Sequence, residues 1–501
     1  MASALPSAAG FAQRIPYAFA RTHGVLAQGE EGGHVVVLTR PDATVEGIAE
    51  LKRVLQRPLT TRAVDAERFA TELARAYNAA GAQVAQLTDD FSRDADLARL
   101  LQDLPAADDL LDTGSQAPVI RMINALLLQA LRERASDVHF EPYEGRAVVR
   151  FRVDGALRDV IEPPRALHGA LVSRVKIMAN LDIAEKRLPQ DGRLALKLGD
   201  KQVDVRVSTL PTGSGERVVL RLLDKDSAQL DLTALGMSGA TLGAMDRLIR
   251  EPHGIVLVTG PTGSGKTTTL YAALSRLPRG TLNMMTVEDP IEYALDGVGQ
   301  TQVNPKIELD FARALRSILR QDPDIIMIGE IRDLETAQIA VQASLTGHLV
   351  LATLHTNDAA SAMTRLADMG VEPYLLASSL LGVLAQRLVR TLCTACRTRA
   401  AATTGEAELL AEIGLPSNMP LYAPGGCSEC RDTGYRGRSG VYELIVVDDA
   451  LRRLIHERAP EHALKAAAAL AGTTSLRRDG ARWIADGTTS LAELVRVSRE
   501  A

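Results

Sequence analysis

The sequence has little of several features that decide the class of a protein. Aromatic residues make up only 3% of its 501 residues, with a single tryptophan at position 483. This scarcity argues against binding single-stranded nucleic acid by base stacking on aromatic rings. The formal net charge of −5 excludes a global electrostatic attraction to nucleic acid, although a local basic groove stays open as an alternative.

Long apolar runs are also missing. No segment reaches the roughly 18 apolar residues that a membrane-spanning helix needs, and the run from Tyr374 to Ala385 predicts a buried helix instead. The first ten residues are small and apolar, but Arg14 follows that run instead of preceding it, so we expect a flexible tail and not a signal peptide. The sequence therefore predicts a cytoplasmic protein that associates with a membrane only through partners.

Cysteine is scarce as well, and its four copies are clustered. Cys393 and Cys396 form one CxxC pair, and Cys427 and Cys430 form a second pair after an interval of 30 residues. A reducing compartment disfavours disulfides, whereas two such pairs supply the four thiolates of a closed tetrahedral shell. We therefore predict a structural Zn²⁺ site, with a redox-active CxxC as the alternative.

The length predicts several domains, because about 150 residues form a typical one. Strand patterns occur at 34–38, 148–155, 194–199, 203–210 and 218–223. Between 231 and 392 apolar runs alternate with helical patterns, which is typical of a parallel sheet with crossover helices. The predicted organisation is a small α/β domain at 1–85, an acidic linker at 86–116, a second α/β domain at 117–226, an α/β core at 231–392, a cysteine-bearing insert at 393–435 and a mainly helical region at 436–501, with helices over 449–457 and 461–471.

The α/β core contains a phosphate-binding loop. The strand pattern at 255–258 runs into GPTGSGKT, which matches the P-loop motif in full and continues into a helical pattern. Backbone N–H groups and a helix N-terminus cradle phosphates in such a loop, while Lys266 reaches the β and γ phosphates and Thr267 binds Mg²⁺. The predicted nucleotide-binding residues are Gly260, Pro261, Thr262, Gly263, Ser264, Gly265, Lys266, Thr267 and Thr268.

Two acidic segments supply the carboxylates that a P-loop enzyme needs. Glu330 follows the buried-strand pattern at 325–328, where it can hold the Mg²⁺ shell or orient water. The segment VEDPIEY at 287–293 presents Glu288, Asp289 and Glu292 around a proline, and one of these carboxylates near the γ-phosphate can polarise the attacking water. The alternative for this second segment is an ordinary acidic turn.

Histidines and arginines form two further candidate sets. His348 and His355 flank an apolar strand, and spacing alone does not separate a phosphate sensor from an ordinary histidine. Arginines recur along the strands of the second α/β domain, where they form either a solvated face or a set that approaches a phosphate. This set comprises Arg150, Arg152, Arg193, Arg206, Arg217 and Arg221.

Taken together, these motifs resemble one family over residues 116–497. The segments ASDVHFEP, RFRVDG and GERVVLRLLDK, the P-loop, TVEDPIEY, DIIMIGE, TGHLVLATLHTN and the four cysteines are similar to the secretion ATPase superfamily. Within it, IPYAFARTHGV at 15–25 resembles the compact first domain of the E-component ATPase of type II secretion systems.

The resemblance implies more than spacing does. It implies a multidomain P-loop NTPase with a RecA-like core and a PAS-like α/β N-terminal domain, assembled as a homo-hexamer. Nucleotide would lie between the second N-terminal domain and the core, with Arg206, Arg221 and also Arg193 reaching its phosphates. Glu292 would be the catalytic carboxylate, Glu330 the Walker B glutamate and His355 the histidine-box residue.

The resemblance also implies partners and a task. ATP hydrolysis would drive the addition of pilin-like subunits, and the first domain would bind the cytoplasmic part of an inner-membrane platform protein, with acidic lipid acting indirectly. We expect no direct contact with nucleic acid and a weak basal activity outside the ring. The alternatives are a type IV pilus assembly ATPase, a nucleic-acid motor for DNA uptake or conjugation, and a non-hydrolysing nucleotide switch.

Overall fold

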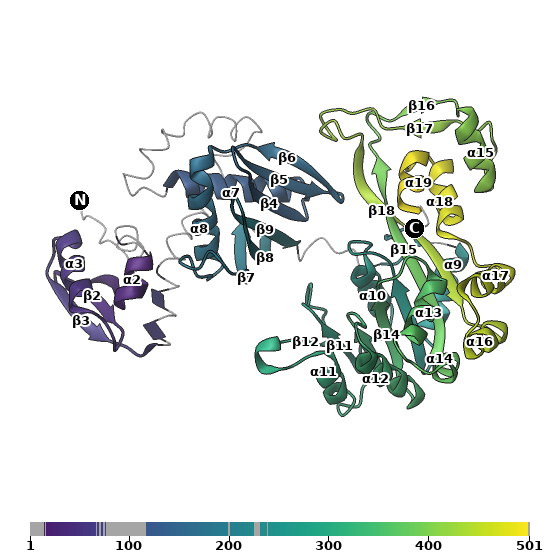
Figure 1. The fold of residues 1–501 in the computed structure, drawn as a ribbon, viewed down its shortest axis with the longest axis horizontal. Helices are drawn as coiled ribbons and strands as arrows, with labels where there is room; N and C mark the ends of the chain where they lie inside the picture. The colour runs from purple at the N-terminus through teal and green to yellow at the C-terminus, as the bar shows by residue number, and fades with distance from the viewer. Residues whose placement is uncertain are drawn as a thin grey trace. The chain divides into compact units, whose positions relative to one another are not determined.

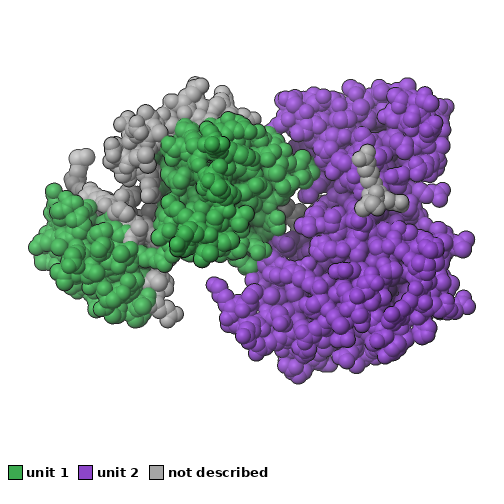
Figure 2. Space-filling model, viewed as in Figure 1, with its two compact units in different colours: residues 1–226 green, residues 227–501 purple. Residues whose placement is uncertain are grey.

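The structure, a computed structural model, falls into two compact units, residues 1–226 and 227–501 (Figure 2, green and purple). It describes residues 15, 17–66, 68, 69, 72, 73, 76, 117–198, 201–224, 231–237 and 239–498. The predicted tail at the start and the predicted linker over 86–116 therefore lie outside the described residues.

The described residues of the first part of unit 1 include a three-stranded sheet and the helices α2 and α3 (Figure 1). Strand β1 pairs antiparallel with β2, and β2 pairs parallel with β3. The β-branched run of β2 is buried along nearly its whole length, which confirms the strand predicted at 34–38. The elements are α2 (Tyr17–His23), β1 (Val25–Glu31), β2 (His34–Thr39), α3 (Val45–Leu55) and β3 (Leu59–Ala63).

The second part of unit 1 is a six-stranded antiparallel sheet in the order β6-β5-β4-β9-β8-β7. Alternate residues of these strands, such as Phe140, Phe151 and Leu220, form one apolar core with helices α7 and α8, so the opposite face is left to polar side chains. The four strands predicted in this region are present. The elements are α7 (Ala117–Arg132), β4 (Asp137–Pro142), β5 (Ala147–Val153), β6 (Ala156–Ile161), η2 (Arg165–Leu167), α8 (His168–Met178), β7 (Gln190–Leu198), β8 (Lys201–Thr212) and β9 (Gly215–Asp224).

Unit 2 is built on a seven-stranded sheet in the order β12-β11-β13-β14-β10-β15-β18. All its strands run parallel except β18, and β10, β13 and β14 are completely buried because apolar clusters cover both faces. The elements up to β15 are α9 (Gly239–Leu248), β10 (Gly254–Thr259), α10 (Lys266–Ser275), β11 (Met284–Glu288), β12 (Gly299–Gln302), η3 (Pro305–Ile307), α11 (Phe311–Ile318), β13 (Ile325–Ile328), α12 (Leu334–Leu345), β14 (Leu349–Leu354), α13 (Ala359–Asp368), α14 (Pro373–Ser379) and β15 (Leu380–Leu392).

The buried helix predicted from Tyr374 to Ala385 is wrong. Helix α14 ends at Ser379, and the next residues form β15, which pairs with β10. A Cβ on Gly382 would lie 2.8 Å from the Leu248 side chain, so the strand packs closely against α9 at this point. Apolar character alone did not separate a short buried helix from a buried strand.

The remaining elements follow β15 in the chain. Helices α16 and α17 confirm the two helices predicted over 449–457 and 461–471. Strand β18 extends the central sheet by pairing antiparallel with β15, although it lies where mainly helix was expected. The elements are β16 (Thr398–Ala400), α15 (Thr404–Glu412), β17 (Leu421–Ala423), β18 (Tyr435–Val446), α16 (Asp449–His456), α17 (Glu461–Leu470), α18 (Leu476–Ala485) and α19 (Leu491–Ser498).

Candidate active site

The four motifs of the α/β core follow the carboxyl ends of four neighbouring parallel strands. The P-loop follows β10, the histidine segment follows β14, Glu330 follows β13 and the acidic segment follows β11. Ligands of open α/β sheets bind at this edge. The sheet order therefore brings together motifs that lie up to about a hundred residues apart in the chain.

The P-loop joins β10 to α10 through three glycines with positive φ. Gly260, Gly263 and Gly265 have φ of +147°, +80° and +85°, a region that side chains with a Cβ rarely adopt. At Gly260 a Cβ would also lie 2.6 Å from both the Gln386 carbonyl oxygen and Ser264 Oγ. The glycine spacing is thus required by backbone geometry, and α10 begins directly after it with its N-terminus at the loop.

Lys266 is buried at the start of α10, with 8% of its surface exposed. Its Nζ donates to the carbonyl oxygens of Gly260 at 2.8 Å and of Pro261 at 3.1 Å. Burial, together with the nearby Arg387 guanidinium, lowers the pKa of Lys266 to about 8. The ammonium therefore has only neutral acceptors among these contacts, and an anion in the loop would bind it more strongly.

A chain of contacts runs from Lys266 to two other motifs. Lys266 Nζ lies 3.4 Å from His355 Nδ1, and His355 Nε2 lies 3.2 Å from a Glu330 carboxylate oxygen. Burial and the neighbouring cations Lys266 and Arg332 lower the pKa of His355, so the ring is neutral at neutral pH. A ring that accepts at Nδ1 donates from Nε2, so His355 links the lysine to Glu330, which also pairs with Arg332.

The acidic segment separates its three carboxylates. Glu288 is 2% exposed and accepts hydrogen bonds from Tyr271, from Thr286 Oγ1 at 2.5 Å and from Gln300 Nε2 at 3.0 Å. Asp289 pairs with Arg332 at 3.4 Å. Glu288 is thus held in a buried hydrogen-bond network, and Asp289 pairs with Arg332, the same arginine that pairs with Glu330.

Glu292 is half-buried in the loop that follows these two residues. The next residue, Tyr293, packs edge-on against Tyr271 with 4.7 Å between ring centroids. Burial raises the pKa of Tyr293 to about 12, so it stays a neutral phenol. Glu292 is thus less buried than Glu288.

His348 lies at the opposite end of β14 from His355. Its Nδ1 contacts the Ala343 carbonyl oxygen at 2.8 Å and Thr346 Oγ1 at 3.1 Å. His348 is thus held by the end of α12, away from the carboxyl edge of the sheet.

In unit 1, four arginines stand in one row across the polar face of the antiparallel sheet. Directly opposed residues bring Arg193, Arg206, Arg221 and Arg152 onto this face, with Asp137 between the last two. Asp137 is 4% exposed and lies 2.9 Å from Arg221 Nε and 3.6 Å from Arg152 Nε. The bond to Nε leaves the two terminal nitrogens of Arg221 available for another anion.

Arg150 and Arg217 belong to a different cluster of the same sheet. Both pair with the buried Glu141, Arg217 at 2.5 Å and Arg150 at 3.5 Å. Burial opposes ionisation of Glu141, but Tyr143 and the two arginines bring its pKa below the usual value. The six candidate arginines thus divide into a row that contains the three expected phosphate ligands and a pair that neutralises one buried carboxylate.

Sequence reasoning missed Gln386, Arg387 and Arg332, although all three contact the motifs. Gln386 Nε2 donates to the Ser264 carbonyl oxygen at 2.6 Å, and Arg387 donates to the Asn357 carbonyl oxygen at 2.7 Å. The available signal was a polar pair inside the otherwise apolar run LLGVLAQRLV, which a buried strand tolerates only when those groups are bonded.

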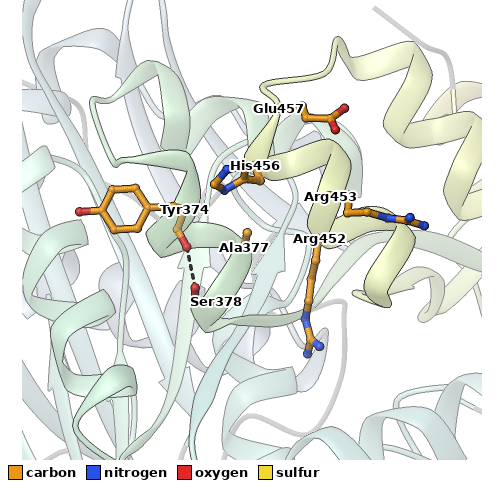
Figure 3. A pocket seen from close by; sticks show the side chains of 7 residues that line it. All are labelled: Tyr374, Ala377, Ser378, Arg452, Arg453, His456 and Glu457. Atoms are coloured by element: carbon orange, nitrogen blue, oxygen red, sulfur yellow. Dashed lines mark hydrogen bonds between the residues drawn. The ribbon is translucent and has the colours of Figure 1, made fainter.

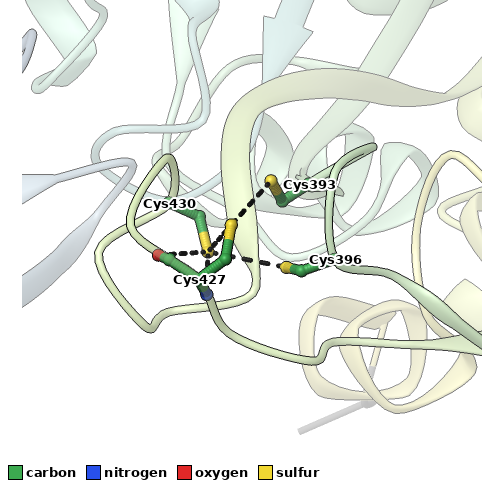
Figure 4. A group of neighbouring side chains, drawn as sticks. All are labelled: Cys393, Cys396, Cys427 and Cys430. Atoms are coloured by element: carbon green, nitrogen blue, oxygen red, sulfur yellow. Dashed lines mark hydrogen bonds between the residues drawn. The ribbon is translucent and has the colours of Figure 1, made fainter.

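The four cysteines point toward one another at the edge of the β16–β17 insert (Figure 4). Three sulfur–sulfur distances are 3.7 to 3.9 Å, and all four sulfurs lie within 4.8 Å of one another. A tetrahedral ion with metal–sulfur bonds of about 2.3 Å separates its ligands by about 3.8 Å. The cluster therefore fits a tetrahedral metal ion.

Backbone donors support thiolates at this cluster. The N–H groups of Gly426 and Gly434 donate to Cys396 Sγ and Cys430 Sγ, each at 3.2 Å. Burial opposes ionisation of the Cys430 thiol, but the N–H groups of Cys427 and Gly434 bring its pKa down to about 7. At Cys396 burial outweighs the N–H of Gly426 and raises the pKa to about 11. Deprotonated sulfurs are the form that binds metal.

A separate hollow of about 540 Å³ lies between α14 and α16 (Figure 3). Its lining mixes the exposed ring of Tyr374 with cationic side chains of α16 and contains none of the motif residues. The lining residues are Tyr374, Ala377, Ser378, Arg452, Arg453, His456 and Glu457.

Within the described ranges, none of the helices combines the length and the hydropathy that crossing a bilayer demands.

Comparisons with known proteins show the family of this chain. Residues 112–496 match the family described as type II/IV secretion system protein, and residues 14–77 match a family model for a domain of GSPII protein E. The chain is 58% identical to the type II secretion system protein HxcR of Pseudomonas aeruginosa, over 97% of this chain and 99% of the relative. It is 51% identical to the type II secretion system ATPase E of Vibrio cholerae, over 97% of each chain.

Among solved structures, the pilus retraction motor PilT with bound ADP shares 25% identity at a TM-score of 0.51, over 75% of this chain and 96% of that one. The ATPase DotB of Legionella pneumophila shares the fold, at 20% identity and a TM-score of 0.55, over 75% and 95% of the two chains. The chain therefore belongs to the type II/IV secretion system protein family and is an ATP-hydrolysing ATPase of its type II E-component group.

Proposed function

We propose that this ATPase works as a homo-hexamer that powers pseudopilus assembly and protein export by a type II secretion system, on the cytoplasmic side of the inner membrane. The observation that carries this proposal is the joint match of an E-type first domain and the ATPase region along nearly the whole chain. The first domain supports the type II assignment over the pilus-assembly alternative.

The P-loop would bind the phosphates of ATP through its backbone N–H groups and Lys266. Thr267, the second residue of α10, would hold Mg²⁺ through its hydroxyl, which is the usual place for this ligand. Glu330 would complete the Mg²⁺ shell or orient water. Mg²⁺ would supply charge neutralisation between the β and γ phosphates.

Glu292 would act as the general base that polarises the attacking water. The resemblance of TVEDPIEY to the family's acidic segment assigns this role to its second glutamate, and Glu292 is half-buried in the loop after β11. His355 would report the γ-phosphate, because its ring joins Lys266 to Glu330 and a phosphate on the lysine competes with that contact.

The arginine row of unit 1 would stabilise the charge that develops on the transferred phosphoryl group. Arg221 has its Nε on Asp137 and its terminal nitrogens available, and Arg206 forms no ion pair with another described residue. Arg193 stands next to Arg206 in the same row. Donors that are held in place before the reaction contribute most to such stabilisation.

The cysteine cluster would hold Zn²⁺ and stabilise the insert. Zn²⁺ favours four thiolates in a closed tetrahedral shell, and the sulfur spacing supports that geometry. A closed shell has no position for water, so the ion would have a structural and not a catalytic role.

The first domain would bind the cytoplasmic part of an inner-membrane platform protein, and acidic lipid would act through that partner. The test measures ATPase activity of the purified protein alone, with the platform protein's cytoplasmic domain, and with that domain on vesicles of acidic phospholipid. We expect a weak basal rate and strong stimulation by the partner. Full activity of a dilute monomer would contradict the hexamer.

The same assay separates the other candidate function. Stimulation by DNA in place of the platform domain would overturn the secretion proposal in favour of a nucleic-acid motor. Glu330→Gln distinguishes a non-hydrolysing switch, because unchanged turnover in that variant would remove the proposed catalytic role of the Walker B carboxylate.

A further inference from the structure

Strand β15 brings a polar pair, Gln386 and Arg387, to the start of the P-loop. The parallel register places Ala385 opposite Thr259, the last residue of β10, so the pair lies level with the first residues of the loop. Neither residue belongs to the four motifs that follow β10, β11, β13 and β14. Both residues therefore lie at the site, and the motifs do not explain what they do there.

Gln386 supports the P-loop from behind. It is 2% exposed, and its Nε2 donates to the Ser264 carbonyl oxygen at 2.6 Å. Its backbone carbonyl oxygen lies 2.6 Å from the position that a Cβ of Gly260 would take. Because the loop rests on both groups, a change in the position of β15 at Gln386 is transmitted directly to the loop.

Arg387 links Gln386 to the histidine segment that follows β14. Its guanidinium donates to the Gln386 carbonyl oxygen at 3.1 Å and to the Asn357 carbonyl oxygen at 2.7 Å. Asn357 is two residues beyond His355. Arg387 is half-buried, and its shortest hydrogen bonds go to these carbonyl oxygens. Asp358 and Glu443 attract its charge from a longer range, without an ion pair among the described residues.

The histidine segment has further anchors at both of its ends. Asp358 caps α13 by accepting from Ser361 N at 2.8 Å and pairs with Lys465 of α17 at 2.9 Å. Glu443 of β18 accepts from the first N–H of α13, at Ala359, at 3.1 Å. On the side of His355, Thr356 N donates to Thr259 Oγ1 of β10 at 2.9 Å, and the two threonine hydroxyls lie 2.7 Å apart. The carbonyl bond to Arg387 adds a restraint at Asn357, between Thr356 and Asp358.

We propose that Arg387 is a positioning residue that couples the P-loop to the segment 355–358 and thereby sets His355 against Lys266 and Glu330. The inference rests on the proposed role of those three residues in ATP hydrolysis. Hydrogen bonds to carbonyl oxygens suit this task, because they hold one geometry yet exchange more readily than a buried ion pair when the segment moves.

Loss of the guanidinium should impair the chemical step more than nucleotide binding. Without it the segment keeps its anchors at Asp358 and Thr356 but loses the restraint at Asn357, so the contact between His355 and Glu330 is set less accurately. A misplacement of about 1 Å at a catalytic group lowers the rate by up to about 100-fold. The P-loop backbone, which Gln386 still supports, continues to bind phosphate.

The test compares Arg387→Gln, Arg387→Lys and a matched control, Arg390→Gln. Arg390 lies three residues further along the same strand, but it pairs with Glu493 at 2.8 Å instead of with the nucleotide motifs. Arg387→Gln should lower kcat by about 10- to 100-fold with KM for ATP changed less than about threefold. Arg387→Lys should recover part of kcat, and Arg390→Gln should lower Tm and leave kcat of the folded protein unchanged.

A double-mutant cycle with His355→Ala decides whether Arg387 acts through the histidine. We expect Arg387→Gln to have little further effect on kcat in the His355→Ala background. Independent, multiplicative effects, or equal losses of kcat in Arg387→Gln and Arg390→Gln at matched Tm, would overturn the inference.

Glu292→Ala separates this inference from the proposed function. If that variant abolishes hydrolysis while Arg387→Gln retains normal kcat, only the role of Arg387 fails. If Glu292→Ala hydrolyses ATP normally, the proposed catalytic set fails first.

Discussion

The P-loop and the cysteine cluster lie in the same unit, and both gather polar groups in partly buried positions, but they satisfy those groups in opposite ways. Lys266 donates to two loop carbonyls and a neutral histidine, and a phosphate can replace each of these contacts. The four sulfurs instead face one another at the spacing of a complete tetrahedral shell. The difference distinguishes a site built to exchange its ligand in every cycle from one built to keep its ion.

The largest effect is expected at Lys266 of the P-loop. Lys266→Ala should lower kcat/KM for ATP by about 1000-fold, because the only buried ammonium of the loop is lost and several phosphate contacts go with it. Steady-state hydrolysis and fluorescent nucleotide binding measure the loss. Lys306→Ala, at an exposed lysine of the same unit, is the control and should match the native chain.

A large effect on stability, with little on chemistry, is expected at the cysteine cluster. Cys427→Ser should abolish binding of one equivalent of Zn²⁺ and lower Tm by roughly 10 °C, because ion binding contributes several kcal/mol to folding of the insert. Metal analysis and calorimetry measure both, with Ser428→Ala in the same CxxC pair as the control. A native Tm together with lost hydrolysis would show that the cluster has a catalytic and not a structural role. The contrast between the two sites would then fail.

Arg221→Ala tests whether the arginine row contributes to ATP hydrolysis at the P-loop. We expect kcat to fall by about 100-fold while the fold is retained, because the variant removes one preorganised donor from the developing phosphate charge. Arg146→Ala is the control, since Arg146 pairs with the exposed Glu162 at 2.6 Å. Equal rates in the two variants would show that Arg221 belongs only to a solvated face of the sheet and has no part in hydrolysis.

A smaller effect concerns pH. The lowered pKa of Lys266, about 8, means that the nucleotide-free protein loses this charge as pH rises above that value. Phosphate binds the protonated form, so ATP affinity should be full below pH 8 and fall by about tenfold for each further pH unit. Titrations with nucleotide between pH 7 and 9.5 measure the slope. Lys266→Arg keeps its charge and should show weaker but pH-independent binding.

Motifs whose spacing is dictated by local geometry could be predicted from the sequence. The three positive φ angles of the P-loop require glycine at those positions, and the strand before the loop is an uninterrupted apolar run. The cysteine pairs were predictable for the same reason, since their spacing alone brings two sulfurs to one ion.

Features that depend on distant pairing were not predictable. The apolar run that forms β15 is a strand because it completes the pairing with β10, a contact that no local pattern records. The bond between Gln386 and Ser264 spans 122 positions of the chain, so the support of the P-loop was missed. In the acidic segment, spacing left three equivalent carboxylates, and only packing on Tyr271 and Thr286 separates Glu288 from the others.

We propose that the sheet edge formed by the carboxyl ends of β10, β11, β13 and β14 hydrolyses ATP with Glu292 as the base. Single-turnover hydrolysis and ATP binding, measured on the same samples of the native chain and of Glu292→Ala, test it most directly. We expect the variant to bind ATP within about twofold of the native chain and to hydrolyse it at least about 100-fold more slowly. Native hydrolysis in Glu292→Ala, with normal binding, would contradict it.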